Sequence, residues 1–354
     1  MTNYQEYVDN AVILLKKLVA TPSVSRDETA AADILEDYII SKGLKHQRWG
    51  NNILCTDTCH DEKRPTILLN AHIDTVKPVS SWTRDPFEPK TEGDRIYGLG
   101  TNDCGGGLMS LLQTFIIMKD KPRTYNLLYL ASAEEEVSGA NGFSLALPHL
   151  PKIDVAIVGE PTGMQPAIAE KGLMVIDGIA HGKSGHAARN EGINAIYKAL
   201  DDLIWLRDYK FEKVSKLLGP AKMTVTVINA GTQHNVVPDE CKFVIDVRTN
   251  EHYTNKEVFE FIQNNVNSEV KARSFRLNSS HIDPNHPLIK RCTDMGMEPF
   301  GSPTLSDQAL MPFPSFKLGP GQSSRSHSAD EYICISEIEH AIQTYMQLLD
   351  GIIL

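Results

Sequence analysis

The stretch TILLNAHIDT, residues 66–75, begins with a short apolar run and ends in polar side chains. Its first part, residues 66–71, predicts a buried strand, because the run is continuous and too short for a helix. Three similar runs, residues 52–55, 126–131 and 154–158, alternate with helical patterns at residues 107–118 and 139–147. Alternation of this kind predicts an α/β fold: a mostly parallel sheet with helices on both faces. Two amphipathic helices, residues 4–19 and 28–40, precede the sheet.

The pattern of the chain changes after about residue 170. Strand-like and helical stretches then follow in the order strand-helix-strand-strand-helix-strand, at residues 173–180, 193–206, 223–228, 241–247, 256–266 and 272–277. This order is that of the ferredoxin-like α+β arrangement. The last part, residues 286–297, 315–318 and 336–349, returns to helix, strand and helix. We therefore expect a main domain in two parts, residues 1–171 and 280–354, interrupted by an inserted domain at residues 172–279.

The composition excludes several classes of protein. The 354 residues carry a net charge of −10, which argues against a nucleic-acid partner and against a basic membrane anchor. No apolar stretch reaches the roughly 20 residues of a membrane-spanning helix, and the start of the chain lacks a secretory pattern. The six cysteines are scattered, which is typical of reduced thiols in a cytoplasmic protein. Cys55 and Cys59 lack a second Cys/His pair at zinc-finger spacing, which disfavours a metal site there.

Polar clusters follow the predicted strands, at residues 70–75, 132–136 and 159–162. Two more lie in a glycine-rich loop, residues 98–107, and near the C-terminus, residues 326–331. Functional groups of open α/β sheets gather beyond the carboxyl ends of the strands. Carboxylates and imidazoles that converge there would repel or stay unpaired unless cations neutralised them, and two divalent ions would do so.

Each cluster taken alone allows another interpretation. A single His-x-Asp is more often a structural hydrogen-bonded pair, and a run of glutamates often begins a solvated helix. A glycine-rich loop before a helix can also bind phosphate. The loop at residues 98–107 has neither a dinucleotide-binding nor a Walker pattern, and Asp103 at its centre would oppose a phosphate.

Taken together, the five clusters resemble the acetylornithine deacetylase / succinyl-diaminopimelate desuccinylase / glutamate carboxypeptidase family of co-catalytic metallohydrolases. The resemblance runs through the whole chain and implies a zinc-aminopeptidase-like catalytic domain with an inserted lid. It implies two divalent metal ions, with Zn as the default and Co or Mn as alternatives. The implied ligands are His72 and Glu160 for one ion, Glu135 and His327 for the other, and Asp103 for both.

The same resemblance implies the catalytic roles. Glu134 would be the general base for a hydroxide that bridges the metals and attacks an amide, and Asp74 would orient His72. In the lid, His186 would stabilise the oxyanion, usually across a homodimer interface.

Three further residues are candidates for substrate binding: Asn235 and Arg248 of the lid, which suit a carboxylate, and Ser324. Two departures from the family pattern are Gly105, where a Lys is common, and Asn190, near the place of a frequent Pro.

The resemblance also implies a small-molecule N-acyl amino acid as substrate. Glu160 and the loop at residues 319–324 favour the deacylases, and within them N-acetylornithine, cleaved to ornithine and acetate in arginine biosynthesis. N-succinyl or N-acetyl derivatives of ornithine, citrulline, lysine or diaminopimelate remain open. A metallo-carboxypeptidase or dipeptidase is the alternative activity. A catalytically silent binding protein would need a lost base or ligand, and none is missing.

Overall fold

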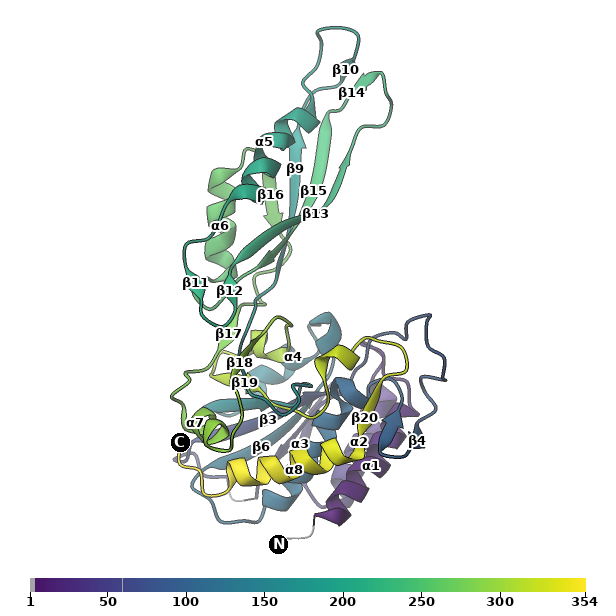
Figure 1. Cartoon of the computed structure of the whole chain (residues 1–354), viewed down its shortest axis with the longest axis vertical. Coiled ribbons are helices and arrows are strands. Elements are labelled where there is room, and N and C mark those ends of the chain that lie inside the picture. Colours follow the sequence, from purple (N-terminus) through teal and green to yellow (C-terminus); the bar gives the residue numbers. More distant parts are fainter. Residues whose placement is uncertain (1–3, 59) are drawn as a thin grey trace. The chain divides into compact units, whose positions relative to one another are not determined.

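The computed structural model describes residues 4–58 and 60–354, so Cys59 lies outside the described residues. The chain forms two compact units (Figure 1). The large unit runs to Ile168 and continues with Ile282–Phe300 and Ser306–Leu354. The inserted unit comprises Ala169–His281 and Gly301–Leu305. None of the described helices is long and apolar enough to cross a bilayer.

The large unit is built on a mixed sheet. Seven of its strands lie in the order β1 (Lys45–Trp49), β2 (Asn52–Thr56), β6 (Asn126–Ser132), β3 (Thr66–His72), β7 (Val155–Val158), β19 (Ser315–Lys317) and β8 (Ala167–Glu170). The central strands β6, β3, β7 and β19 pair in parallel, and the outer pairs are antiparallel. The predicted sheet, parallel in its middle, is therefore confirmed. A separate small sheet, β20 (Tyr332–Cys334), β5 (Arg95–Tyr97) and β4 (Lys90–Glu92), was not predicted.

Alternate residues of the buried strands pack on opposite faces of this sheet. Ile67 and Leu69 belong to a core shared with α1 (Gln5–Val19), α2 (Thr29–Ser41), α3 (Gly106–Met118), α7 (Pro287–Asp294) and α8 (Ile335–Leu349). Leu68 belongs to a second core with Phe143 of the short α4 (Phe143–Ala146). The helix predicted at residues 139–147 is shorter in the structure: only Phe143–Ala146 are α-helical, and a 3-10 turn, Leu147–His149, follows. Gly139 and Gly142 lie so close to Glu134 and Ala133 that a side chain at either position would clash.

The inserted unit has the predicted ferredoxin-like order: β9 (Met174–His181), α5 (Ala195–Asp208), β13 (Lys222–Ala230), β15 (Glu240–Arg248), α6 (Asn255–Asn265) and β16 (Glu269–Ala272). Its sheet, β13-β15-β9-β16, is antiparallel throughout. Two short antiparallel pairs also belong to the unit: β10 (Gly185–His186) with β14 (Val236–Val237), and β11 (Val214–Ser215) with β12 (Gly219–Pro220).

The strand predicted at residues 272–277 is misplaced, because the strand ends at Ala272. The next residue, Arg273, is exposed and pairs through its guanidinium with Asp177.

Candidate active site

His72 stands at the carboxyl end of β3, where the parallel strand β6 ends beside it. Its ring is buried, and Nδ1 lies 2.8 Å from the carbonyl oxygen of Asp74. A carbonyl oxygen only accepts, so this contact places the ring proton on Nδ1. The lone pair of Nε2 therefore points to the carboxylates, as in a metal-binding imidazole. Nε2 lies 3.3 Å from Asp103 Oδ1 and 3.7 Å from Glu160 Oε1.

Asp103 presents one oxygen to each of two histidines. Oδ1 faces His72, and Oδ2 lies 3.6 Å from Nε2 of His327. Burial acts to raise the pKa of Asp103, but the combined effects of His72, Ser326 and His327 outweigh it and the pKa is lowered. The backbone is held by Glu331, whose Oε1 accepts the N–H groups of Asn102 at 2.8 Å and of Asp103 at 2.9 Å. Sequence analysis missed Glu331, although it lies in the cluster at residues 326–331.

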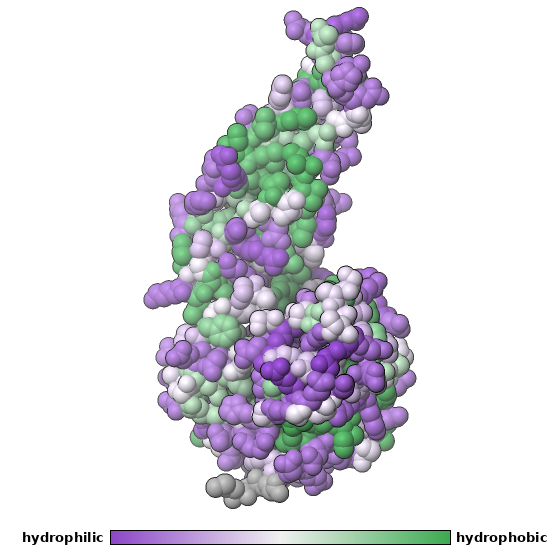
Figure 2. Space-filling view, turned by 45° about the vertical axis from the view of Figure 1, so that its right-hand side comes forward, coloured by the Kyte–Doolittle hydropathy of each residue, from purple (hydrophilic) through white to green (hydrophobic). Residues whose placement is uncertain are grey.

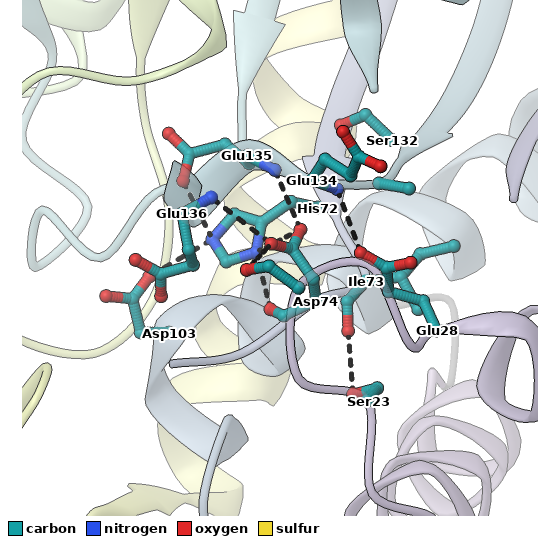
Figure 3. A network of polar contacts seen from close by, with 12 residues as sticks. Ser23, Glu28, His72, Ile73, Asp74, Asp103, Ser132, Glu134, Glu135 and Glu136 are labelled. Atoms are coloured by element: carbon teal, nitrogen blue, oxygen red, sulfur yellow. Dashed lines mark hydrogen bonds and ion pairs between the residues drawn. The ribbon is translucent and has the colours of Figure 1, made fainter. Parts of the chain in front are cut away.

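In the run of three glutamates after β6, the residue beside the second histidine is one position later than predicted. Glu136, which was not predicted, joins the second histidine: its Oε2 lies 2.9 Å from Nε2 of His327. Oxygen and nitrogen atoms of His72, Asp103 and Glu136 all lie within 4.8 Å of one another, as the ligands of two neighbouring ions that share Asp103 would. Figure 3 shows Glu135 and Glu136 on the same side of the His72 ring as Asp103.

Glu134, the predicted general base, points away from this cluster (Figure 3). Its carboxylate accepts two hydrogen bonds from Asn141, from the backbone N–H at 3.1 Å and from Nδ2 at 2.9 Å. The cause is the backbone: Glu134 has a φ of 52°, in the left-handed region, which turns its side chain away from those of the next two residues. The geometry therefore contradicts the prediction of Glu134 as base.

Glu135, the predicted ligand, lies nearer the position expected of a base. Its Oε2 is 4.0 Å from His72 Nε2, farther than the oxygens of Asp103 and Glu160. Burial raises the pKa of the Glu135 carboxyl group well above its usual range, an effect that His72 opposes. A raised pKa suits a group that must take up a proton and release it again near neutral pH.

Asp74 orients His72 through its backbone carbonyl rather than through its side chain. Its carboxylate oxygen Oδ1 is 3.7 Å from Nδ1 of the ring, too far for a hydrogen bond. Instead the carboxylate accepts the N–H groups of Glu135 at 3.0 Å and Glu136 at 3.2 Å, and the hydroxyl of Ser25 at 2.7 Å. Asp74 thus links the end of β3 to the turn that carries both glutamates.

The electrostatics of the cluster fit divalent cations. Oε1 of Glu160 and Oε1 of Glu136 are buried and have no hydrogen-bond partner among the described residues. Burial and the neighbouring Asp103 raise the pKa of Glu160 to about 8, whereas the hydrogen bond to Glu136 raises the pKa of His327 to about 9. Buried oxygens without donors are costly, and a cation would satisfy them. The residues present therefore fit one ion at His72, Asp103 and Glu160, and a second at Asp103, Glu136 and His327.

The remaining predicted residues are Ser324 of the large unit and three residues of the inserted unit. Ser324 is exposed in a turn three positions before His327. In the inserted unit, His186 and Asn235 are close, because the N–H of Ala187 donates to the carbonyl of Asn235 at 3.0 Å. The guanidinium of Arg248 is paired with Asp246, at 2.9 Å from Nε to Oδ1.

Residues 68–351 match the model of peptidase family M20/M25/M40. The chain belongs to this family. It is thus an enzyme that hydrolyses amide bonds, and the resemblance drawn from the five clusters is confirmed. Among the described residues, the M20 enzyme carries groups of His, Asp and Glu that suit metal ions.

Curated relatives of this M20 enzyme carry two activities in their names. It is 28% identical to an acetylornithine deacetylase of Proteus mirabilis, over 96% of this chain and 95% of the relative. It is 26% identical to a succinyl-diaminopimelate desuccinylase of a Sulfurovum species, over 79% of each chain. Among solved structures, a dinuclear metal-binding M20 peptidase of Bacillus subtilis superposes with a TM-score of 0.73 at 16% identity, covering 98% of both chains. This last likeness confirms the fold.

Proposed function

We propose that this M20 enzyme is a dinuclear deacylase of N-acyl amino acids that removes the acetyl group of N-acetylornithine. The observation that carries the dinuclear centre is Asp103, whose two oxygens face two different histidines. The proposed ligands are His72, Asp103 and Glu160 for one ion and Asp103, Glu136 and His327 for the other. Zn is the proposed metal, with Co or Mn as alternatives, because imidazole and carboxylate together suit these ions.

Bound divalent ions polarise an amide carbonyl and make a water molecule more acidic. A side chain of the protein must then transfer the proton of this water. Glu135 is the proposed general base: its carboxylate lies beside the cluster and is not needed in either set of three ligands. It would take the proton of the attacking water and give it to the departing amine, as a single acid–base group can do in successive steps.

The lid residues and Ser324 keep the roles that the family resemblance gave them. His186 would stabilise the oxyanion, and Asn235, Arg248 and Ser324 would bind the substrate. A substrate carboxylate at Arg248 would have to compete with Asp246, which now holds the guanidinium. The name of the Proteus mirabilis relative supports N-acetylornithine. The desuccinylase relative supports the alternative of an N-succinyl amino acid.

A homodimer through the inserted unit is part of the proposal, as is a cytoplasmic location. One face of α5 leaves Tyr197, Leu200 and Ile204 exposed, at the spacing of a single helix face. Val227 and Ile228 of β13 are exposed as well. Figure 2 shows apolar surface gathered on this unit. An apolar surface of this kind is typical of an association site.

A substrate panel tests the proposal. The purified enzyme is stripped with a chelator, reloaded with Zn, Co or Mn, and assayed with N-acetyl and N-succinyl derivatives of ornithine, citrulline, lysine and diaminopimelate, and with dipeptides. We expect N-acetylornithine to give the highest kcat/KM and the chelated enzyme to be inactive. A higher kcat/KM for a succinyl compound would refute the proposed substrate and leave the amide hydrolase intact. Full activity without metal would refute the dinuclear centre.

A further inference from the structure

Cys104 follows Asp103 directly and its side chain reaches the same cluster. The residue is 1% exposed. Its sulfur, a ring nitrogen of His72 and a carboxylate oxygen of Glu160 all lie within 4.8 Å of one another. Among the five cysteines whose placement the structure describes, Cys104 is the one that falls in such a group. The group shares His72 and Glu160 with the first proposed ion site, so the thiol lies beside that ion rather than at a separate place.

The spacing suits a shared ion. Tetrahedral zinc, with bonds of about 2.1 Å to nitrogen and about 2.3 Å to sulfur, holds these two ligand atoms roughly 3.6 Å apart. A mutual limit of 4.8 Å therefore requires only a small contraction of the side chains around the cation. Oε1 of Glu160 is buried without a hydrogen-bond partner among the described residues, which leaves it available to the same ion.

We propose that the thiolate of Cys104 is an additional ligand of the ion held by His72, Asp103 and Glu160. The inference depends on the proposed metal centre and deepens it. When the sulfur–metal bond forms, the S–H bond breaks and its proton passes to solvent, with no change of oxidation state. A sulfur ligand is soft, so it raises the preference of this position for Zn or Co over the harder Mn.

Cobalt spectroscopy tests the inference without measuring activity. The metal-free enzyme is titrated with Co(II), and the near-ultraviolet region is examined for the sulfur-to-cobalt charge-transfer band, which imidazole and carboxylate ligands do not produce. We expect this band in the wild-type enzyme and its loss in Cys104→Ser and Cys104→Ala. The matched control is Cys292→Ala, which removes an equally buried thiol of α7 that belongs to no ligand group among the described residues. This variant should keep the band.

The outcomes are distinct. Two bound cobalt ions without the band, or a band that persists in Cys104→Ser, would refute the thiolate ligand and leave the metal centre standing. Failure of the wild-type enzyme to bind any cobalt would refute the centre, and the inference with it. The absence of the band from the wild-type enzyme with two bound cobalt ions would refute the inference even if a variant does not fold.

Metal competition gives a second measurement. Removal of the thiolate should lower the ratio of Zn to Mn affinity at one of the two positions by about tenfold or more, because losing even an outer partner of a metal ligand typically costs that much. The ratio in Cys292→Ala should match the wild-type value. An unchanged ratio in Cys104→Ser would contradict a sulfur ligand.

Discussion

In the glutamate run, the proposed general base is Glu135 and the proposed metal ligand is Glu136, each one residue later than predicted from the sequence. A pair of matched substitutions tests this assignment. Glu135→Gln keeps the size of the side chain and removes its ability to take a proton. A general base contributes about 10²- to 10⁴-fold to the rate, which corresponds to about 3–5 kcal/mol of barrier. We therefore expect kcat to fall by that factor while both metal ions remain bound, since neither set of three ligands includes Glu135.

The control is Glu134→Gln, whose carboxylate accepts two hydrogen bonds from Asn141. Glutamine keeps one acceptor oxygen, so one of these bonds is lost and stability should fall by about 1–3 kcal/mol. Turnover of the folded variant should stay within about tenfold of the wild-type value. Steady-state kinetics, elemental analysis and thermal unfolding measure the three quantities. A collapse of kcat in Glu134→Gln, with nearly normal kcat in Glu135→Gln, would refute the assignment.

Three further predictions concern metal content and packing. Glu136→Gln should halve the metal stoichiometry measured by elemental analysis, because Glu136 is proposed for one ion only; two ions per chain would contradict this role. Gly107→Ala should destabilise the protein by about 3 kcal/mol or more in thermal unfolding, since an added Cβ would lie 1.7 Å from the carbonyl oxygen of Gly159; an unchanged melting temperature would show that this contact is not tight. Asp57→Asn breaks a buried ion pair with Arg123, with 2.6 Å between Oδ2 and Nη2, and should cost about 3–5 kcal/mol in denaturant unfolding; a cost near zero would mean that the pair is not isolated from water.

The sheet and the inserted unit could be predicted because their patterns are local. A run such as residues 66–71 is mostly apolar and is buried at every position, and a strand buried on both faces needs such a run. The exposed strand β4 has no such pattern, and its three residues are all exposed. Its place in the small sheet depends on pairing with β5, which sequence periodicity does not reveal.

The sequence predicts where the site lies in the fold, but it does not predict which of the three glutamates has which role. His72 and Glu160 follow parallel strands, so their places at the sheet edge follow from topology. The direction of each glutamate in the run 134–136 depends on the local backbone, which takes a positive φ at Glu134. Three identical residues in sequence carry no sign of that angle. The way in which Asp74 orients His72 could not be predicted either. The contact to the ring is made by its backbone carbonyl, and every residue has such a carbonyl.

The residues of the proposed ion-binding cluster come from both parts of the large unit, before and after the inserted unit. His72 and Asp103 precede the inserted unit, whereas His327 and Glu331 follow it, and Glu331 holds the backbone at Asp103. During synthesis, the first histidine and the shared aspartate therefore leave the ribosome more than 200 residues before their partners. A nascent chain can offer all three proposed ligands of only one ion site until His327 has emerged and folded back. Full loading of the enzyme with metal is thus a step that follows translation.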